Sequence, residues 1–107
     1  MSKSEMLAIQ LKKDLLNMLH RANASHVGGC LSSLDIVSVL YEGVLRIKPS
    51  RPRASNRDRF ILSKGHTGAV VFATLANKGF FPKSWLNTFC KNDGKIPGHI
   101  DSHEVPG

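Results

Sequence analysis

The sequence predicts an α/β domain, and three observations support this class. Apolar residues recur at spacings of three and four over residues 4–24, which is typical of an amphipathic helix. A short apolar run at 60–62 is suited to a buried strand. A turn of small residues at 63–68 then leads into a second helical pattern over 69–78. This order of elements favours helices around an incomplete parallel sheet, with one clear strand in the chain.

The other elements are predicted from their patterning. Adjacent glycines in segment 25–30 interrupt the helical period and favour a turn that could serve as a functional loop. Segment 33–45 is apolar over much of its surface and is predicted to be a buried helix, with Ser32 and Asp35 in a capping arrangement.

In the second half of the chain, prolines and glycines mark the expected boundaries of the elements. Prolines and arginines mark 49–59 as an exposed connection, and Gly79 is expected to end the helix over 69–78. A short helix is expected at 84–91, and residues 92–107 are expected to form a loop. Residues 1–107 are therefore predicted to be a single, incomplete domain.

The length and charge restrict the class of protein only broadly. A chain of 107 residues lies near the size at which incomplete burial leaves stability marginal. The net charge of +7 would suit nucleic acid, an anionic membrane surface or a phosphorylated metabolite. Cys30 and Cys90 allow one disulfide at most, and we expect reduced thiols. We see neither a signal-peptide core nor a run long enough to span a membrane, so we expect a soluble, cytoplasmic protein without a membrane partner.

The turn at 65–68 is the strongest candidate for chemistry on physical grounds. The start of a helix after a parallel strand presents free backbone N–H groups and the positive end of a dipole, which suit an anion. Open α/β sheets bind ligands beyond the carboxyl ends of their strands, where His66 would fall. The alternative is that Gly65 and Gly68 only form a tight connection and that His66 is a surface residue.

Four segments, in order along the chain, resemble motifs of the transketolase family. Segment 56–66 (NRDRFILSKGH) resembles a signature that enters a strand and ends at Gly-His, and 25–32 (SHVGGCLS) resembles the family's His-x-Gly-Gly loop. Segments 97–99 (PGH) and 105–107 (VPG) match its Pro-Gly-His loop and a later Pro-Gly. Segment 25–32 has no proline after His26, and in this respect it most resembles the separately encoded N-terminal subunits of the family. The resemblance covers nearly the whole chain but only the early part of the family's thiamine-diphosphate-binding fold.

The resemblance implies an activity and three catalytic residues. The family transfers a two-carbon ketol unit from a ketose phosphate to an aldose phosphate, with thiamine diphosphate carrying the electrons. By motif, His66 would lie beside the cofactor diphosphate, while His26 and His99 would bind the oxygens of the sugar phosphate. Imidazoles that titrate near neutrality suit proton transfer and hydrogen bonding of this kind. Taken singly, His26 or His99 could instead be a solvated loop histidine.

Two parts of the family's active site are not found in the sequence. The family holds Mg²⁺ or Ca²⁺ with a Gly-Asp-Gly segment and a later Asn that fall outside this chain, and Asp93-Gly94 lacks the preceding glycine. We therefore assign no metal ligand. The glutamate that activates the aminopyrimidine belongs to a C-terminal transketolase half or subunit. The resemblance thus implies a dimer-based assembly in which the isolated chain is inactive.

Other interpretations remain open at this point. Cys90, His99 and His103 could bind zinc, although no Cys-x-x-Cys pair supports this. The arginines of 51–59 could bind nucleic acid, but no aromatic residues are interleaved with them, so a solvated loop is favoured and no nucleic-acid partner is expected. The chain could also be a non-catalytic remnant that only associates with other proteins, or belong to a related deoxyxylulose-phosphate-synthase-type enzyme.

Overall fold

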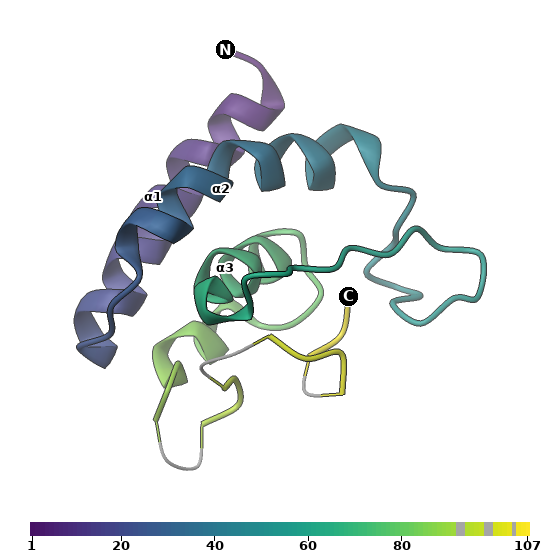
Figure 1. Cartoon of the computed structure of the whole chain (residues 1–107). Helices are drawn as coiled ribbons and strands as arrows, with labels where there is room; N and C mark the ends of the chain where they lie inside the picture. The colour runs from purple at the N-terminus through teal and green to yellow at the C-terminus, as the bar shows by residue number, and fades with distance from the viewer. Residues whose placement is uncertain (92–93, 98–99, 104) are drawn as a thin grey trace.

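A computed structural model describes residues 1–91, 94–97, 100–103 and 105–107. In this part of the chain α1 and α2 lie side by side, and α3 packs against both (Figure 1). Short helices of other types lie between α2 and α3 and after α3. The elements in order are α1 (Lys3–Ala22), α2 (Val27–Val39), the π-helix η1 (Leu40–Val44), the 3-10 helix η2 (Gly65–Thr67), α3 (Ala69–Asn77) and the 3-10 helix η3 (Lys83–Thr88).

Helix α1 confirms the helix predicted over 4–24. Its N-terminus carries a capping box, in which the Ser2 hydroxyl accepts from the Glu5 N–H and the Glu5 carboxylate accepts from the Ser2 N–H. Its C-terminus is closed by Asn23, whose φ of 51° places it in the left-handed region. The predicted apolar stripe is buried and consists of Leu7, Leu11, Leu15, Met18 and Leu19.

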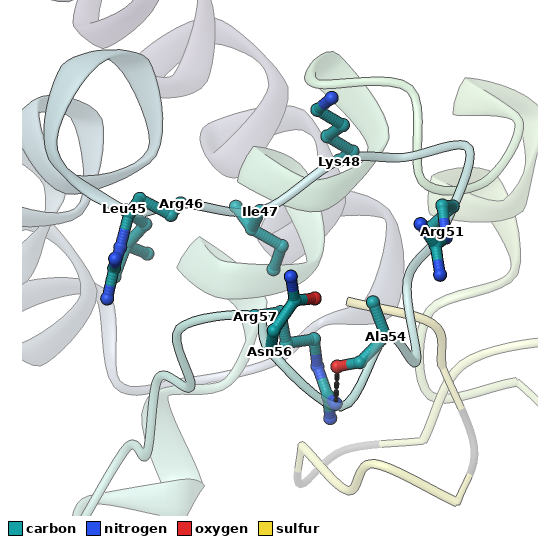
Figure 2. Close-up of a pocket in the computed structure, with 8 residues that line it drawn as sticks. All are labelled: Leu45, Arg46, Ile47, Lys48, Arg51, Ala54, Asn56 and Arg57. Atoms are coloured by element: carbon teal, nitrogen blue, oxygen red, sulfur yellow. Dashed lines mark hydrogen bonds between the residues drawn. The ribbon is translucent and has the colours of Figure 1, made fainter.

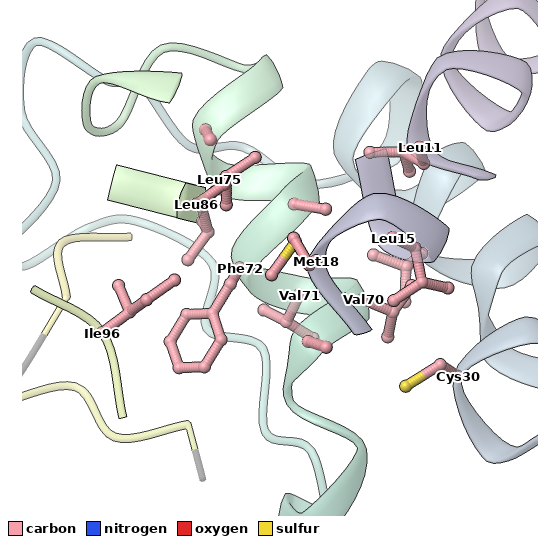
Figure 3. Packing of buried hydrophobic residues seen from close by; sticks show 14 of the residues in the cluster. Leu11, Leu15, Met18, Cys30, Val70, Val71, Phe72, Leu75, Leu86 and Ile96 are labelled. Atoms are coloured by element: carbon pink, nitrogen blue, oxygen red, sulfur yellow. The ribbon is translucent and has the colours of Figure 1, made fainter. Parts of the chain in front are cut away.

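Helix α3 is the centre of the hydrophobic core. Every residue from Ala69 to Ala76 is buried, so the helix is apolar on all sides because it is covered on all sides. Leu11 and Leu15 of α1 lie near Val70 on one side, while Ile96 lies near Phe72 on the other (Figure 3). The predicted end at Gly79 is confirmed by its φ of 87°.

Helix α2 differs from its prediction in where it begins and in how far it is buried. It starts at Val27 rather than after a Ser32 cap, so both glycines lie in its first turn and not in a loop. Leu34 and Val37 are 1% exposed, but Ile36 on the opposite face is 62% exposed. The expectation of a buried helix over 33–45 is therefore wrong for one face, because no described residues cover it.

The strand predicted at 60–62 is not confirmed, and the described residues contain no strand. The segment runs nearly straight from the preceding connection at 49–59, the arginine-rich loop, towards η2 (Figure 1). Phe60 and Leu62 pack partly against the core, whereas Ile61 is 86% exposed. A strand forms only when a neighbouring strand takes up its backbone N–H and C=O groups. Because the described part of the chain offers no second strand, the predicted sheet does not form there.

The segments after α3 contain less helix than predicted. The helix expected at 84–91 is the shorter 3-10 helix η3, which follows Pro82. The described residues of the tail form no helix or strand, in agreement with the predicted loop. This tail is nevertheless fixed to the core, since Ile96 and Val105 are buried.

One segment of the described residues corrects the expectation about membrane spans. Val27–Val44 is long and apolar enough to cross a membrane by length and composition alone. Core helices of soluble proteins pass the same test, so the finding is weak evidence for a span. Helix α2, which makes up most of this segment, packs against α1 and α3.

Candidate active site where two histidine turns meet

The structure brings His26 and His66 together. Their ring centroids are 4.9 Å apart, and the rings meet edge to face at an interplanar angle of 66°. His26 stands immediately before α2, and His66 lies in η2, immediately before α3. Both side chains are exposed. Two of the three predicted site residues therefore share one surface, although they come from different turns.

The two turns are held together by close packing behind the histidines. A Cβ atom on Gly29 would lie 2.6 Å from Cγ2 of Thr67, so the first turn of α2 rests directly on η2. The Cys30 thiol donates to the Thr67 carbonyl at 3.6 Å. Burial raises the pKa of Cys30, which keeps this thiol protonated and able to donate. The glycine predicted to form a turn is thus required by a contact between helices.

A pocket of about 310 Å³ opens beside the histidine pair. Its walls combine the two imidazoles with apolar side chains and two cysteines. The lining residues are Leu19, Asn23, Ala24, Ser25, His26, Cys30, His66, Ala69, Phe89 and Cys90. No sequence pattern indicated that Phe89 or Cys90 would reach this pocket, because both come from a segment that follows η3. Partial burial raises the pKa of Cys90, so its exposed side chain is a thiol at neutral pH.

Lys64 is a further residue of this region that sequence reasoning did not single out. Its ammonium group donates to the Gly29 carbonyl at 3.0 Å and to the Ser32 hydroxyl at 3.1 Å. It lies two residues before His66, inside the motif that ends at Gly-His. The motif indicated that Lys64 lies near the site. Its bonds to Gly29 and Ser32 could not be predicted, because these partners are 35 and 32 residues away in the sequence.

The third predicted residue, His99, lies outside the described residues. The next residue along the chain, Ile100, is described and reaches the start of α3. Its backbone nitrogen lies 2.9 Å from the position of a Cβ on Gly68. Gly68 is therefore required by a close backbone approach and not only by a tight turn.

The start of α3 fits an anionic cofactor less well than predicted, whereas His66 fits it. No described side chain caps this helix at Gly68, which would leave its first backbone N–H groups free for an anion. However, Ala69 and Val70 are only 2% and 0% exposed, so the backbone N–H groups of this turn are covered. The exposed His66 imidazole, in contrast, can donate a hydrogen bond to a phosphate oxygen. Of the described residues in this turn, His66 is the one that fits contact with thiamine diphosphate.

The arginine-rich loop forms a second pocket of about 430 Å³ that Figure 2 shows in close-up. Arg46 binds the Asp58 carboxylate at 3.1 Å, and Arg57 donates to the Ala54 carbonyl at 2.9 Å. Hydrogen bonding to Arg46 lowers the pKa of Asp58. Arg53 donates to the Ser102 carbonyl at 2.8 Å. Arg46, Arg53 and Arg57 thus bind oxygen atoms of their own loop and of the tail.

The acidic, cysteine and histidine side chains form no metal centre in the described part of the chain. Among residues 1–91, 94–97, 100–103 and 105–107, no three such side chains come close enough to hold an ion. Cys90 and His103 therefore form no cluster with a third described ligand. His99, the remaining member of the alternative zinc set, lies outside these ranges.

Comparison with known proteins identifies the family of the chain. Residues 5–107 match the family described as "Transketolase, thiamine diphosphate binding domain". The fold and the histidine turns therefore define part of a thiamine-diphosphate-binding domain. The chain belongs to the transketolase family and represents an N-terminal portion of it, as separately encoded subunits of the family do.

Individual relatives show how much of the family's length is represented. An apulose-4-phosphate transketolase subunit of Phocaeicola vulgatus is 36% identical over 96 residues, covering 90% of this chain and 34% of the relative. The 6-deoxy-6-sulfo-D-fructose transketolase subunit SqwG of a Clostridium species is 36% identical over 97 residues, covering 91% and 35%. The transketolase of Homo sapiens is 33% identical, covering 97% and 17%. The chain thus spans about a third of the length of these separately encoded relatives.

Proposed function

We propose that this chain supplies the N-terminal part of an active site that transfers a two-carbon ketol unit from a ketose phosphate to an aldose phosphate. The observation that carries this proposal is the pairing of His26 with His66, at 4.9 Å, on the rim of one pocket. Membership of the transketolase family supports the same reaction class. The rest of the N-terminal subunit and a C-terminal half or subunit would together complete the site in a dimer-based assembly, in line with the names of the relatives, which describe them as subunits.

The chain's own residues would bind and orient the reactants. Thiamine diphosphate, when bound, would supply the electron sink for carbon–carbon bond cleavage. The His66 imidazole would donate a hydrogen bond to the cofactor diphosphate. The neighbouring imidazole of His26 would bind a sugar oxygen and exchange a proton with it, and His99 would hold a sugar hydroxyl. A divalent cation, Mg²⁺ or Ca²⁺, would be held by residues outside this chain.

The lining of the pocket beside His26 and His66 suits these proposed roles in binding and proton transfer. Leu19, Ala69 and Phe89 present apolar surface, while the two imidazoles are the groups best placed to transfer protons. Apolar walls exclude water from the face of a bound ligand and so strengthen the polar contacts that remain. We also propose a cytoplasmic location, which suits the free thiols of Cys30 and Cys90.

The proposal is tested by joining the chain to the remaining two thirds of a separately encoded N-terminal subunit, adding a C-terminal transketolase half, and measuring ketol transfer between a ketose phosphate and an aldose phosphate. We expect His26→Ala, His66→Ala and His99→Ala each to lower kcat/KM by about 100-fold or more, the usual effect of losing a proton-transfer group. His20→Ala is the matched control, because His20 is an exposed histidine of α1 that does not line the pocket. Wild-type kinetics in the His26 and His66 variants would contradict the proposal.

The need for a second component is tested by calorimetry. Thiamine diphosphate with magnesium should bind the isolated chain weakly or not at all, because one described imidazole cannot hold a diphosphate in water. The assembled complex should bind both tightly. Tight, stoichiometric binding to the isolated chain would overturn the proposal that this site is shared.

A further inference from the structure

We propose that Lys64 is a positioning residue, which holds the His26 turn against the His66 turn through its bonds to the Gly29 carbonyl and the Ser32 hydroxyl. The expected effect on catalysis rests on the proposed function. The effect on the geometry of the two histidines does not, since it concerns the folded chain alone.

The backbone of Lys64 is fixed to the His66 turn. Its carbonyl accepts from the Thr67 N–H at 2.9 Å and from the Thr67 hydroxyl at 2.8 Å. These two bonds fix the residue at the N-terminal end of η2. The Lys64 side chain therefore starts from a defined point two residues before His66.

The side chain ends in the first turns of α2, on the His26 side. The Gly29 carbonyl accepts from the Lys64 ammonium at 3.0 Å and also from the hydroxyls of Ser32 and Ser33, at 2.9 Å and 3.1 Å. Ser32 in turn accepts from Lys64 at 3.1 Å. Lys64, Gly29 and Ser32 thus form a closed triangle of hydrogen bonds, which begins three residues beyond His26.

The start of α2 depends on contacts of this kind to stay in place. His26 has a φ of 69°, in the left-handed region that side chains rarely adopt, and its side chain makes no capping hydrogen bond to a described residue. A residue in this conformation persists only when its surroundings hold it there. The bond from Lys64 and the Gly29–Thr67 contact both join this turn to the segment that carries His66.

The chemistry of lysine suits a tie between oxygen atoms. An ammonium group has three donors and no acceptor, and it binds neutral oxygens more strongly than an uncharged amide does. None of the ion pairs formed by the described residues includes Lys64, and its side chain is half-buried between α2 and η2. Among the described residues, the charged ammonium group of Lys64 therefore binds the Gly29 carbonyl and the Ser32 hydroxyl.

The first test uses nuclear magnetic resonance on the full chain, with the cross-peak between the His26 and His66 ring protons as the readout. We expect this cross-peak in the wild type, its loss in Lys64→Met, and its retention in Lys64→Arg, which keeps a charged donor. Lys78→Met is the matched control. It removes another half-buried lysine, paired with Glu42 at 2.8 Å, and should leave the cross-peak unchanged.

A second variant covers the case in which Lys64→Met does not fold. Ser32→Ala removes one of the two acceptors of Lys64 on an exposed surface, and it should weaken the cross-peak without removing it. If Lys64→Met folds, an undiminished cross-peak in that variant would overturn the proposal. If Lys64→Met does not fold, an undiminished cross-peak in Ser32→Ala would overturn it.

The second test measures ketol transfer in the assembled complex. Lys64→Met should lower kcat/KM by about tenfold or more, because displacing a catalytic group by about 1 Å can slow a reaction by about 100-fold. Lys64→Arg should recover most of the loss. If the wild-type complex is itself inactive, the proposed function fails and the cross-peak alone decides the role of Lys64. If the wild type is active and Lys64→Met equals it, the positioning role is wrong.

Discussion

Gly29 and Thr67 approach each other so closely that a Cβ atom on Gly29 would lie 2.6 Å from Cγ2 of Thr67. This contact joins the turn that carries His26 to the turn that carries His66. Gly28, one residue earlier, has no described atom within 4 Å of the same position. Of these two adjacent glycines, Gly29 is required by a contact with another described segment, whereas Gly28 is not.

The first prediction follows from this difference. Gly29→Ala should destabilise the chain by about 1 to 3 kcal/mol, the usual cost of overpacking a filled site, as measured by denaturant unfolding. Gly28→Ala should be neutral or stabilise the chain by up to about 1 kcal/mol, because alanine favours helix more than glycine does. Adding Thr67→Ser to Gly29→Ala removes Cγ2 while keeping the hydroxyl bond to Lys64, and it should restore much of the lost stability. No recovery in that double variant would show that the clash lies elsewhere.

The second prediction separates the backbone of His26 from its imidazole. Because His26 has a φ of 69°, His26→Gly should be at least as stable as His26→Ala, for which the left-handed region costs about 1 kcal/mol. Both variants lack the imidazole and should lose ketol transfer equally in the assembled complex. Thermal unfolding of the two chains checks the first expectation. An alanine variant clearly more stable than the glycine variant would contradict it.

The third prediction concerns Asp14, which joins three elements. Its carboxylate accepts from Gln10 of α1 at 3.1 Å, from Asn77 of α3 at 2.7 Å and from Lys83 of η3 at 3.1 Å. Asp14→Ala leaves these donors without this acceptor and should lower the free energy of unfolding by about 1.5 to 3 kcal/mol.

Asp35→Ala is the control for this measurement, since Asp35 is an exposed carboxylate of α2. It should change the free energy of unfolding by less than about 0.5 kcal/mol. Equal effects of the two substitutions would show that Asp14 does not link the three elements.

The fourth prediction is a loss of stability in alkali caused by Tyr41. Burial raises the pKa of Tyr41 from 10.0 to about 12. The folded state thus favours the protonated phenol, so this contribution to stability is complete below pH 10 and is lost as the pH rises from about 10 to 12. Tyr41 is the only tyrosine in the chain, so the ultraviolet absorbance of tyrosinate reports its titration directly.

Tyr41→Phe provides the comparison for the alkaline measurement. It keeps the ring between Phe60 and Phe80 but lacks the ionisable hydroxyl, so its unfolding free energy should fall less steeply over this range. A tyrosine midpoint near 10 in the folded chain would contradict the prediction.

Local sequence signals were enough to predict α1 and the C-terminal end of α3. The apolar stripe from Leu7 to Leu19 repeats with the helical period, and Gly79 supplies the positive φ that ends α3. Each of these features depends on residues that are close together in the sequence. Periodicity and capping preferences therefore decide them without knowledge of the rest of the fold.

The start of α2 and the strand could not be predicted in this way. Adjacent glycines normally interrupt a helix, but here both lie in the first turn of α2, and Thr67 occupies the space that a side chain on Gly29 would need. Apolar residues at 60–62 satisfy the pattern of a buried strand, yet a strand also depends on a neighbour that the described residues do not provide. In both places a distant contact decides the structure.

The candidate site was predicted in part. Resemblance to a family indicated His26 and His66, and the structure places their rings together. The pattern of the sequence did not reveal Lys64, whose partners Gly29 and Ser32 are far away along the chain. The bond from Lys64 to Gly29 joins two of the motifs, and this contact could be seen only in the fold.

The segment 60–62 has a practical consequence for work with the protein. No backbone hydrogen bond joins Phe60, Ile61 or Leu62 to another described residue, and the Ile61 side chain is exposed to solvent. Such a segment can act as a template on which further copies stack, as unprotected strands do in aggregates. We expect light scattering of the purified chain to rise steeply with concentration. A charged gatekeeper, Ile61→Lys, should suppress this rise while leaving the helical core intact.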